Sequence, residues 1–236
     1  MRNMLILAFI LISVSCLGQI PTDWQVDGVK GKVKNMEIVM NGVGESAYFK
    51  EVNVYNEEGY YLSKKMSVSD DKAPDVTMFL NMMENYEPYK GNKRSTTSFL
   101  GDKVEIAKGT EEWQSDSVRL NISNGISWGE SSEEKEVLIN ITTETFNEKG
   151  LLVKSLYEDE FRSSTDLPGK RLETVNTFNT EGYLISFRVN DLNKNTSTEL
   201  KVVNVELDIK GNVIVQKHYE DDVLVLNKTF TYEYYD

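Results

Sequence analysis

A five-residue phrase recurs four times along this chain: a large apolar residue, Asn or Asp, two variable residues and Gly. Its copies are Tyr55–Gly59, Phe146–Gly150, Phe178–Gly182 and the looser Leu207–Gly211. Asn or Asp at the start and Gly at the end suit a type I turn, because Gly adopts positive φ without steric cost. Runs rich in Val, Ile, Thr and aromatic residues flank each copy, so each phrase predicts the tip of a β-hairpin.

The spacing of the phrases indicates a repeated unit. The copies begin 91, 32 and 29 residues apart. A period of roughly 30 residues holds two strands, the tip and a return loop. No change in composition divides residues 19–236 into parts. We therefore predict a single all-β domain over 19–236, a twisted antiparallel meander of repeated β-hairpins.

One segment inside the longest gap departs from the β pattern. Pro74 suits the first position of a helix, and apolar residues follow it at helical spacing. We predict a short helix over 74–86 (Pro74 to Tyr86). Because Met side chains adapt to irregular ligands, its Met-rich part is a candidate ligand-binding or lid segment. The residues concerned are Met78, Phe79, Met82 and Met83.

Residues 1–18 have the pattern of a signal peptide. Arg2 precedes the uninterrupted apolar stretch Leu5–Val14, which is too short to span a bilayer as a helix. Two ways of processing remain open. Either cleavage follows Gly18, or Ser13–Cys16 is a lipobox and Cys16 is lipidated as the first mature residue. Both imply export.

Composition limits the chemistry and the partners. Cys16 is the only cysteine, so no disulfide, catalytic thiol or Cys-based metal site is expected. Removing residues 1–18 takes away Arg2 and no acid, so the net charge of −12 becomes −13. That charge argues against nucleic acid and against anionic lipid headgroups as partners. No apolar span follows residue 18, and the mature protein is predicted not to be integral to a membrane.

Three groups of residues were weighed as chemical sites. His218 is the sole histidine and has no Gly-x-Ser-x-Gly partner, so a strand residue is the favoured interpretation. The acidic groups Asp70–Asp71, Glu158–Asp159–Glu160 and Asp221–Asp222 are expected in turns. The alternating oxygen donors from Asp191 to Glu199 lack the Gly and Glu of an EF-hand and favour a polar hairpin loop. We predict no catalytic residue, no cofactor and no metal.

The aromatic residues allow two interpretations. Tyr55, Tyr61, Phe146 and Tyr232 are among eleven aromatic residues in or beside predicted strands. A face for sugars or peptides is one use of such residues. Cross-strand ladders that stabilise a sheet are the more common use, and we favour them here.

Several phrases resemble the YD repeats of Rhs-type proteins, above all the shorter exported versions of Gram-negative bacteria. The resemblance rests on Phe146–Lys154 and Phe178–Ile185, with Val29–Lys34 and Tyr232–Asp236 similar to the start and end of such proteins. It implies hairpins stacked side by side in a twisted sheet, and it supplies no catalytic residues. Three of the four copies carry Asn where YD repeats carry Asp.

The sequence predicts a non-enzymatic, exported β-repeat protein that binds or scaffolds an unknown protein, glycan or lipid of the cell envelope. Its expected location is the periplasm, the outer membrane through a lipid tether, or the extracellular space. One alternative is a periplasmic carrier of an apolar ligand, such as a lipid, on a curved sheet. Another is a glycan hydrolase that uses paired carboxylates.

Overall fold

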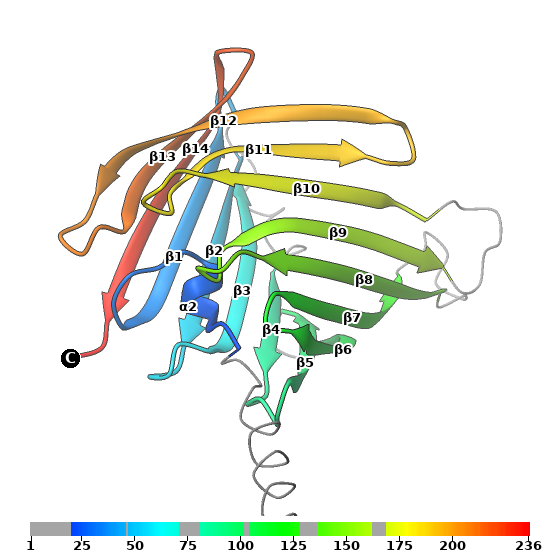
Figure 1. Ribbon diagram of the computed structural model, residues 1–236. Coiled ribbons are helices and arrows are strands. Elements are labelled where there is room, and N and C mark those ends of the chain that lie inside the picture. The colour runs from blue at the N-terminus through cyan, green and yellow to red at the C-terminus, as the bar shows by residue number, and fades with distance from the viewer. Residues whose placement is uncertain (1–19, 46, 71–80, 102–103, 128–135, 162–168) are drawn as a thin grey trace, which may run out of the picture.

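A computed structural model describes residues 20–45, 47–70, 81–101, 104–127, 136–161 and 169–236. In this part of the chain fourteen strands form a closed barrel, with consecutive strands paired antiparallel (Figure 1). The strands are β1 (Val33–Gly42), β2 (Ala47–Tyr55), β3 (Tyr61–Asp70), β4 (Met82–Tyr86), β5 (Lys93–Leu100), β6 (Val104–Ser115), β7 (Val118–Ser127), β8 (Glu136–Phe146), β9 (Leu152–Phe161), β10 (Arg171–Phe178), β11 (Leu184–Asp191), β12 (Thr196–Leu207), β13 (Val213–Glu220) and β14 (Val223–Tyr234).

The predicted all-β antiparallel meander is confirmed, and the structure adds its closure. β1 pairs with β14 over nine register partners, with Met36 opposite Tyr232 and Ile38 opposite Phe230. A sheet closed on itself has no free edge strand for another chain to join. The YD-repeat resemblance implied hairpins stacked side by side in a twisted sheet, and it did not imply this closure, in which the first and last strands bond to each other.

The four phrases form hairpin tips, as predicted. In the first, the Asn56 side-chain oxygen accepts the backbone N–H groups of Glu58 and Tyr60, at 3.0 and 2.9 Å. The Gly59 N–H donates to the Asn56 carbonyl, and Gly59 has φ +90°. The same bonds recur at the tips that begin with Asn147, Asn179 and Asp208. Because these tips follow even-numbered strands of the meander, all four lie at one end of the barrel.

The helix predicted over 74–86 is wrong where the structure describes it. Residues 82–86 form β4, which pairs with β3 on one side and with β5 on the other. Hydrogen bonds to two neighbouring strands outweigh the helical spacing of the apolar residues. Residues 74–80 lie outside the described part of the chain.

A single helical turn, α2 (Asp23–Val26), lies at the end of the barrel that carries the four tips (Figure 1). Thr22 and Gln25 form a reciprocal capping box that starts it. The Trp24 backbone N–H donates to the Gly59 carbonyl at 3.1 Å, and its indole N–H donates to the Val33 carbonyl at 2.8 Å. Helices in the described residues include none with the length and apolarity needed to cross a membrane.

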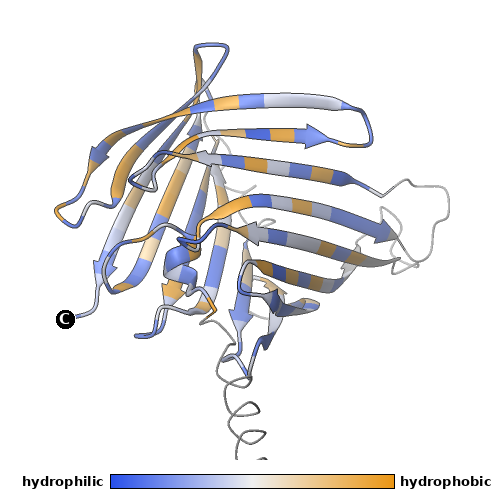
Figure 2. Cartoon of the chain, in the orientation of Figure 1, coloured by the Kyte–Doolittle hydropathy of each residue, from blue (hydrophilic) through white to orange (hydrophobic). Residues whose placement is uncertain are grey.

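The two faces of the barrel wall carry different chemistry. Register partners share a face of a sheet, so Arg94 and its partner Glu111, both buried, point into the lumen. Their neighbours Lys93 and Glu112 are also partners and are exposed on the outer face. Figure 2 shows hydrophilic and hydrophobic residues alternating along many of the strands.

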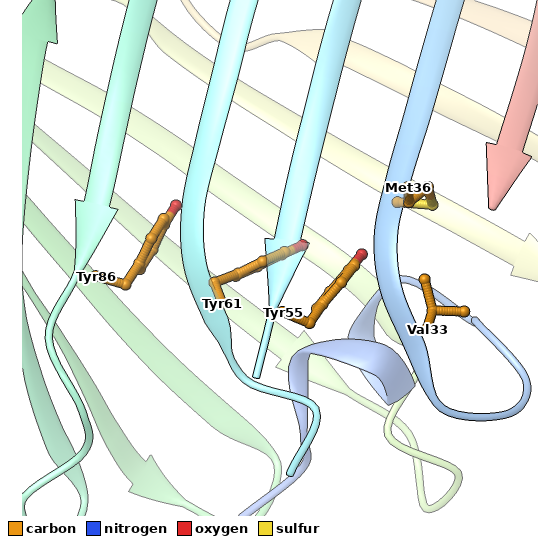
Figure 3. Close-up of a cluster of buried hydrophobic side chains, with 5 residues drawn as sticks. All are labelled: Val33, Met36, Tyr55, Tyr61 and Tyr86. Atoms are coloured by element: carbon orange, nitrogen blue, oxygen red, sulfur yellow. The ribbon is translucent and has the colours of Figure 1, made fainter. Parts of the chain in front are cut away.

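The tightest apolar packing lies beside α2. Val33, Met36, Tyr55, Tyr61 and Tyr86 form a buried cluster on β1 to β4, shown in Figure 3. The rings of Tyr55 and Tyr61 stack across β2 and β3 with centroids 5.1 Å apart. Such pairs are worth about 0.5–1.5 kcal/mol beyond the area they bury. Here the aromatic residues form the cross-strand ladder that the sequence favoured.

We expect Gly59→Ala to lower the free energy of unfolding by about 2–4 kcal/mol. An added Cβ would overlap the indole of Trp24, and φ of +90° is strained for Ala. Gly44→Ala is the matched control, because its φ is +82° and no heavy atom lies within 4 Å of the added Cβ. We expect Gly44→Ala to lower the free energy of unfolding only by the backbone strain, about 1 kcal/mol. Urea denaturation of both variants measures the difference, and equal losses would mean that α2 does not pack on this tip.

Candidate functional site

A buried charge cluster fixes α2 to the inner wall. Both Asp23 carboxylate oxygens accept from Arg94, at 2.9 and 3.2 Å, and one accepts from Arg119 at 3.1 Å. The Tyr61 backbone N–H also donates to Asp23, at 2.8 Å. Because the acceptor belongs to α2 and the donors to β3, β5 and β7, the cluster holds the helical turn across this end of the lumen.

The two arginines have further carboxylate partners. Arg94 donates to Glu111 at 2.5 Å, and Arg119 donates to Glu144 at 2.8 Å. Burial alone would lower the pKa of Arg94, but the carboxylates of Asp23 and Glu111 raise it above its usual value. The pKa of Arg119 is likewise raised against its burial by Glu111 and Glu144. Both guanidinium groups are already paired with carboxylates of the protein, so we assign the cluster to anchoring rather than to ligand binding.

Asp27, just after α2, is a second buried acid. Its carboxylate accepts from the hydroxyl of Tyr55 at 2.5 Å and from the hydroxyl of Tyr61. Burial raises the pKa of Asp27, while Lys64 and the two tyrosines act in the opposite direction. Asp27 lies directly after α2 and lines the lumen cavity described next, which we call the main cavity.

A cavity of about 260 Å³ lies in the lumen beside α2 and spans the barrel from β1 and β2 to β9 through β14. Its wall carries apolar and polar side chains in similar numbers. The apolar residues are Val26, Met36, Ile38, Leu151, Leu152, Phe178, Leu184, Val213, Phe230 and Tyr232, and the polar ones are Asp27, Glu51, Asn53, Asn176, Tyr183, Asn204, Gln216 and Lys228. Apolar surface together with placed polar groups is typical of a small-molecule site.

A row of hydrogen-bonded side chains crosses the far wall of this cavity. Asn204 donates to the Leu184 carbonyl at 3.0 Å and accepts from Gln216 at 2.9 Å. The Gln216 carbonyl oxygen lies 2.7 Å from His218 Nε2, so this ring nitrogen carries the hydrogen. His218 Nδ1 and Asn53 Oδ1 are buried and have no hydrogen-bond partner among the described residues.

A second lumen cavity, of about 230 Å³, lies on the opposite side and is polar. Its wall contains hydroxyl, amide and charged groups, with Asn121 Oδ1 buried and unpartnered within the described part of the chain. The residues include Lys64, Glu84, Thr96, Arg119, Asn121, Ser123, Asn140, Thr142 and Glu144. A wider hollow of about 900 Å³ lies outside, against the β8–β9 and β10–β11 tips, and is open to solvent.

His218 lies on the inner face of β13 and is 1 % exposed. Burial lowers its pKa to about 4, and the charge of Lys228 adds to this shift. The imidazole is therefore neutral at pH 7. Its Phe187 contact, edge-on with centroids 5.5 Å apart, and its Gln216 bond make it part of the wall.

The acidic candidates do not meet at one place. Asp221 and Asp222 form the β13–β14 turn, as predicted, and Asp70 ends β3. Glu158, Asp159 and Glu160 lie within β9 and not in a turn, because all three pair with β8 and Glu158 also pairs with β10. Glu158 forms an outer-face ion pair with Arg171 at 2.8 Å. The glycan-hydrolase alternative stays an untested prediction.

The residues from Asp191 to Glu199 belong to the β11–β12 hairpin. Asp191 accepts the backbone N–H groups of Asn193 and Lys194, and Glu199 pairs with Arg188. No group of three potential metal-ligating residues occurs among the described residues. Met82 and Met83 lie in β4, while Met78, Phe79 and Cys16 lie outside the described residues.

Sequence reasoning missed the lumen and the residues that line it. Asp23, Arg94 and Arg119 are charged residues in polar or alternating segments, where solvent exposure is the usual outcome. One signal was present: Thr22 followed three residues later by Gln25 is a capping box, and it marks the start of α2. Lys228, which faces the main cavity, had no local signal.

No protein-family model matches this chain, and no curated protein matches it. Among solved structures it is similar to a porin-like protein from Bacteroides vulgatus, with a TM-score of 0.51, 8 % identity, and coverage of 85 % of this chain and 98 % of that one. A porin-like protein from Bacteroides uniformis gives a TM-score of 0.41 and 10 % identity, covering 91 % of this chain and 100 % of that one.

The first of these similarities supports the fold alone, and it corrects the resemblance drawn from the sequence. The chain is not a YD-repeat, Rhs-like protein. Its turn phrases fit a barrel meander, since Asn or Asp and Gly are favoured by the tip geometry in hairpins of any fold. The chain has the fold of a closed, fourteen-stranded antiparallel β-barrel of the kind seen in that porin-like protein.

Proposed function

We propose that this protein is an exported, water-exposed β-barrel of the bacterial envelope that binds a small amphipathic molecule in its lumen. The observation that carries the proposal is the cavity of about 260 Å³ beside α2. Its apolar side chains provide a surface for a hydrocarbon body, and its polar side chains provide hydrogen bonds and charge. The proposal combines the binding role and the carrier role expected from the sequence, with the lumen in place of an open curved sheet.

Ion pairs on the outer face support an aqueous surrounding. Six of them join neighbouring strands around the barrel, and their side chains are partly or largely exposed. They are Lys34–Glu233, Lys50–Glu37, Lys93–Glu112, Lys154–Glu173, Arg171–Glu158 and Arg188–Glu199, at 2.5–3.3 Å. A membrane barrel presents an apolar band to lipid, and a Lys or Arg at its midplane costs about 2–4 kcal/mol. Water is the better solvent for such a face.

The location follows from the outer face together with the predicted signal peptide. An exported barrel surrounded by water belongs in the periplasm or at a membrane surface through a lipid on Cys16. We expect the purified protein to stay monodisperse in buffer without detergent, as measured by light scattering. Aggregation that only detergent relieves would contradict the water-exposed barrel and favour membrane insertion.

We expect Leu184→Trp to weaken binding of an apolar fluorescent probe at least tenfold. Leu184 lies in the cavity wall, and an indole in its place occupies much of the free volume. N-phenyl-1-naphthylamine, whose fluorescence rises in apolar sites, reports the affinity by titration. Val203→Trp adds the same side chain to the outer face of the neighbouring strand β12, where Val203 is 38 % exposed, and serves as the control.

The wild-type protein and the control are expected to bind the probe alike. Equal affinity in all three proteins would mean that the probe binds outside the lumen. No binding by the wild-type protein would contradict the proposed function itself. Circular dichroism spectra of the two variants verify that the barrel has formed.

A further inference from the structure

The main cavity contains a cation that forms no ion pair with the residues that the structure describes. Lys228 lies on the inner face of β14, where its register partners are Gln216 on β13 and Met40 on β1. It is half-buried and lines the cavity. Within the residues that the structure describes, its ammonium forms no hydrogen bond and no ion pair. By contrast, Arg94 has two carboxylate partners and Arg119 has three, and Lys64 in the second lumen cavity lies over the ring of Tyr61.

The surroundings of Lys228 do not supply the missing partner. Along β14 its inner-face neighbours are Leu226 and Phe230, both apolar. On β13, Gln216 is neutral, and His218, with its pKa lowered to about 4, is neutral at pH 7. Among the residues that the structure describes, the carboxylate that acts on it is that of Glu51, two strands away on β2.

The Glu51 carboxylate accepts a hydrogen bond from another side chain and does not pair with Lys228. Glu51 Oε1 accepts a hydrogen bond from the Asn53 side chain at 2.8 Å, and it attracts Lys228 without forming an ion pair. Burial lowers the pKa of Lys228, and the Glu51 charge opposes this only in part. A partly buried ammonium without a hydrogen-bonded partner carries an uncompensated desolvation cost, and a bound anion removes that cost.

We propose that Lys228 binds the anionic head group of the lumen ligand, and that this ligand is a small carboxylate with an apolar body. The inference rests on the proposed function and names its ligand class. Phe230 on β14 and Ile38 on β1 are register partners of each other, lie two residues along the strands from Lys228 and its partner Met40, and line the cavity. A carboxylate at Lys228 therefore places the hydrocarbon chain against these side chains, in the cavity that Leu184 on β11 also lines.

A matched pair of probes tests the head group separately from the apolar body. Octanoate and 1-octanol have the same chain length and differ in charge. Isothermal titration calorimetry at pH 7 is expected to show that the wild-type protein binds octanoate at least tenfold more tightly than 1-octanol. Lys228→Met removes the charge and keeps much of the side-chain volume. It is expected to bring octanoate affinity down to that of 1-octanol and to leave 1-octanol affinity unchanged.

Two further variants act as controls. Lys217→Met removes the same charge from the outer face of β13, where Lys217 is the register partner of the exposed Val203, and is expected to leave both affinities unchanged. Lys228→Arg keeps the charge at the cavity and is expected to keep most of the preference for octanoate.

Failure of this inference is distinguishable from failure of the proposed function. Equal binding of octanoate and 1-octanol by the wild-type protein overturns the anionic head group and leaves lumen binding standing. An equal loss of both affinities in Lys228→Met also overturns it, because the residue then acts through packing. Binding of neither probe overturns both proposals.

Discussion

Replacing Arg94 with Met is expected to lower the free energy of unfolding by about 3–5 kcal/mol. The Arg94 side chain is fully buried and bonds to both Asp23 oxygens and to Glu111. Without it, Asp23 and Glu111 share Arg119, which also pairs with Glu144, and an uncompensated charge in the interior costs more than Met packing restores. Urea denaturation followed by tryptophan fluorescence measures the change.

The neighbouring residue provides a matched control. Lys93→Met removes an ion pair with Glu112 at 3.3 Å, but both side chains are exposed on the outer face. We expect a change below about 1 kcal/mol, as for other surface pairs. The double variant Asp23→Asn, Arg94→Met is expected to lose less free energy of unfolding than its two single variants together. The reason is that Asp23→Asn removes one of the charges that Arg94→Met leaves without its partner. Equal effects of Arg94→Met and Lys93→Met would contradict a buried anchoring cluster.

Much of the strand architecture follows from local sequence, because hairpin tips are local structures. Asn56 and Gly59 lie three residues apart, and the bonds that define the tip form within that stretch. The antiparallel meander was therefore predictable. Closure was not, since Val33 pairs with Tyr234 across nearly the whole chain and no local residue pattern encodes that contact.

The candidate site was hidden for a related reason. In a strand of an open sheet, a charged residue at alternate positions indicates the solvent face. In a closed barrel one of the two faces is the lumen, so the same alternation places Arg119 inside and Glu112 outside. Which face is internal depends on closure. The cavity-facing Lys228 could not be separated by sequence from Lys217, its outward counterpart on the neighbouring strand β13.

The pH dependence of stability is expected to carry the signature of His218, the sole histidine of the chain. Its folded-state pKa of about 4 lies below the ordinary value of 6.5, so the unfolded chain takes up the proton first as the pH falls. The contribution of His218 is therefore present above pH 6.5 and is lost between about pH 6.5 and pH 4. The physical causes are burial in the wall and the charge of Lys228. A proton added at Nδ1 would also meet no acceptor among the described residues.

Because one pKa unit corresponds to about 1.4 kcal/mol, the wild-type protein should lose up to about 3 kcal/mol more than His218→Gln between pH 7 and pH 4. Urea denaturation of both proteins at pH 7, 6, 5 and 4 measures this difference. Asp27, whose raised pKa stabilises the fold as the pH falls, titrates in both proteins and cancels in the comparison. Lys228→Met leaves His218 in place without the neighbouring charge. Between pH 7 and pH 4 this variant is therefore expected to lose less free energy of unfolding than the wild-type protein. Parallel pH profiles for wild-type and His218→Gln proteins would mean that the imidazole titrates as in the unfolded chain, and that the wall around it is open to water.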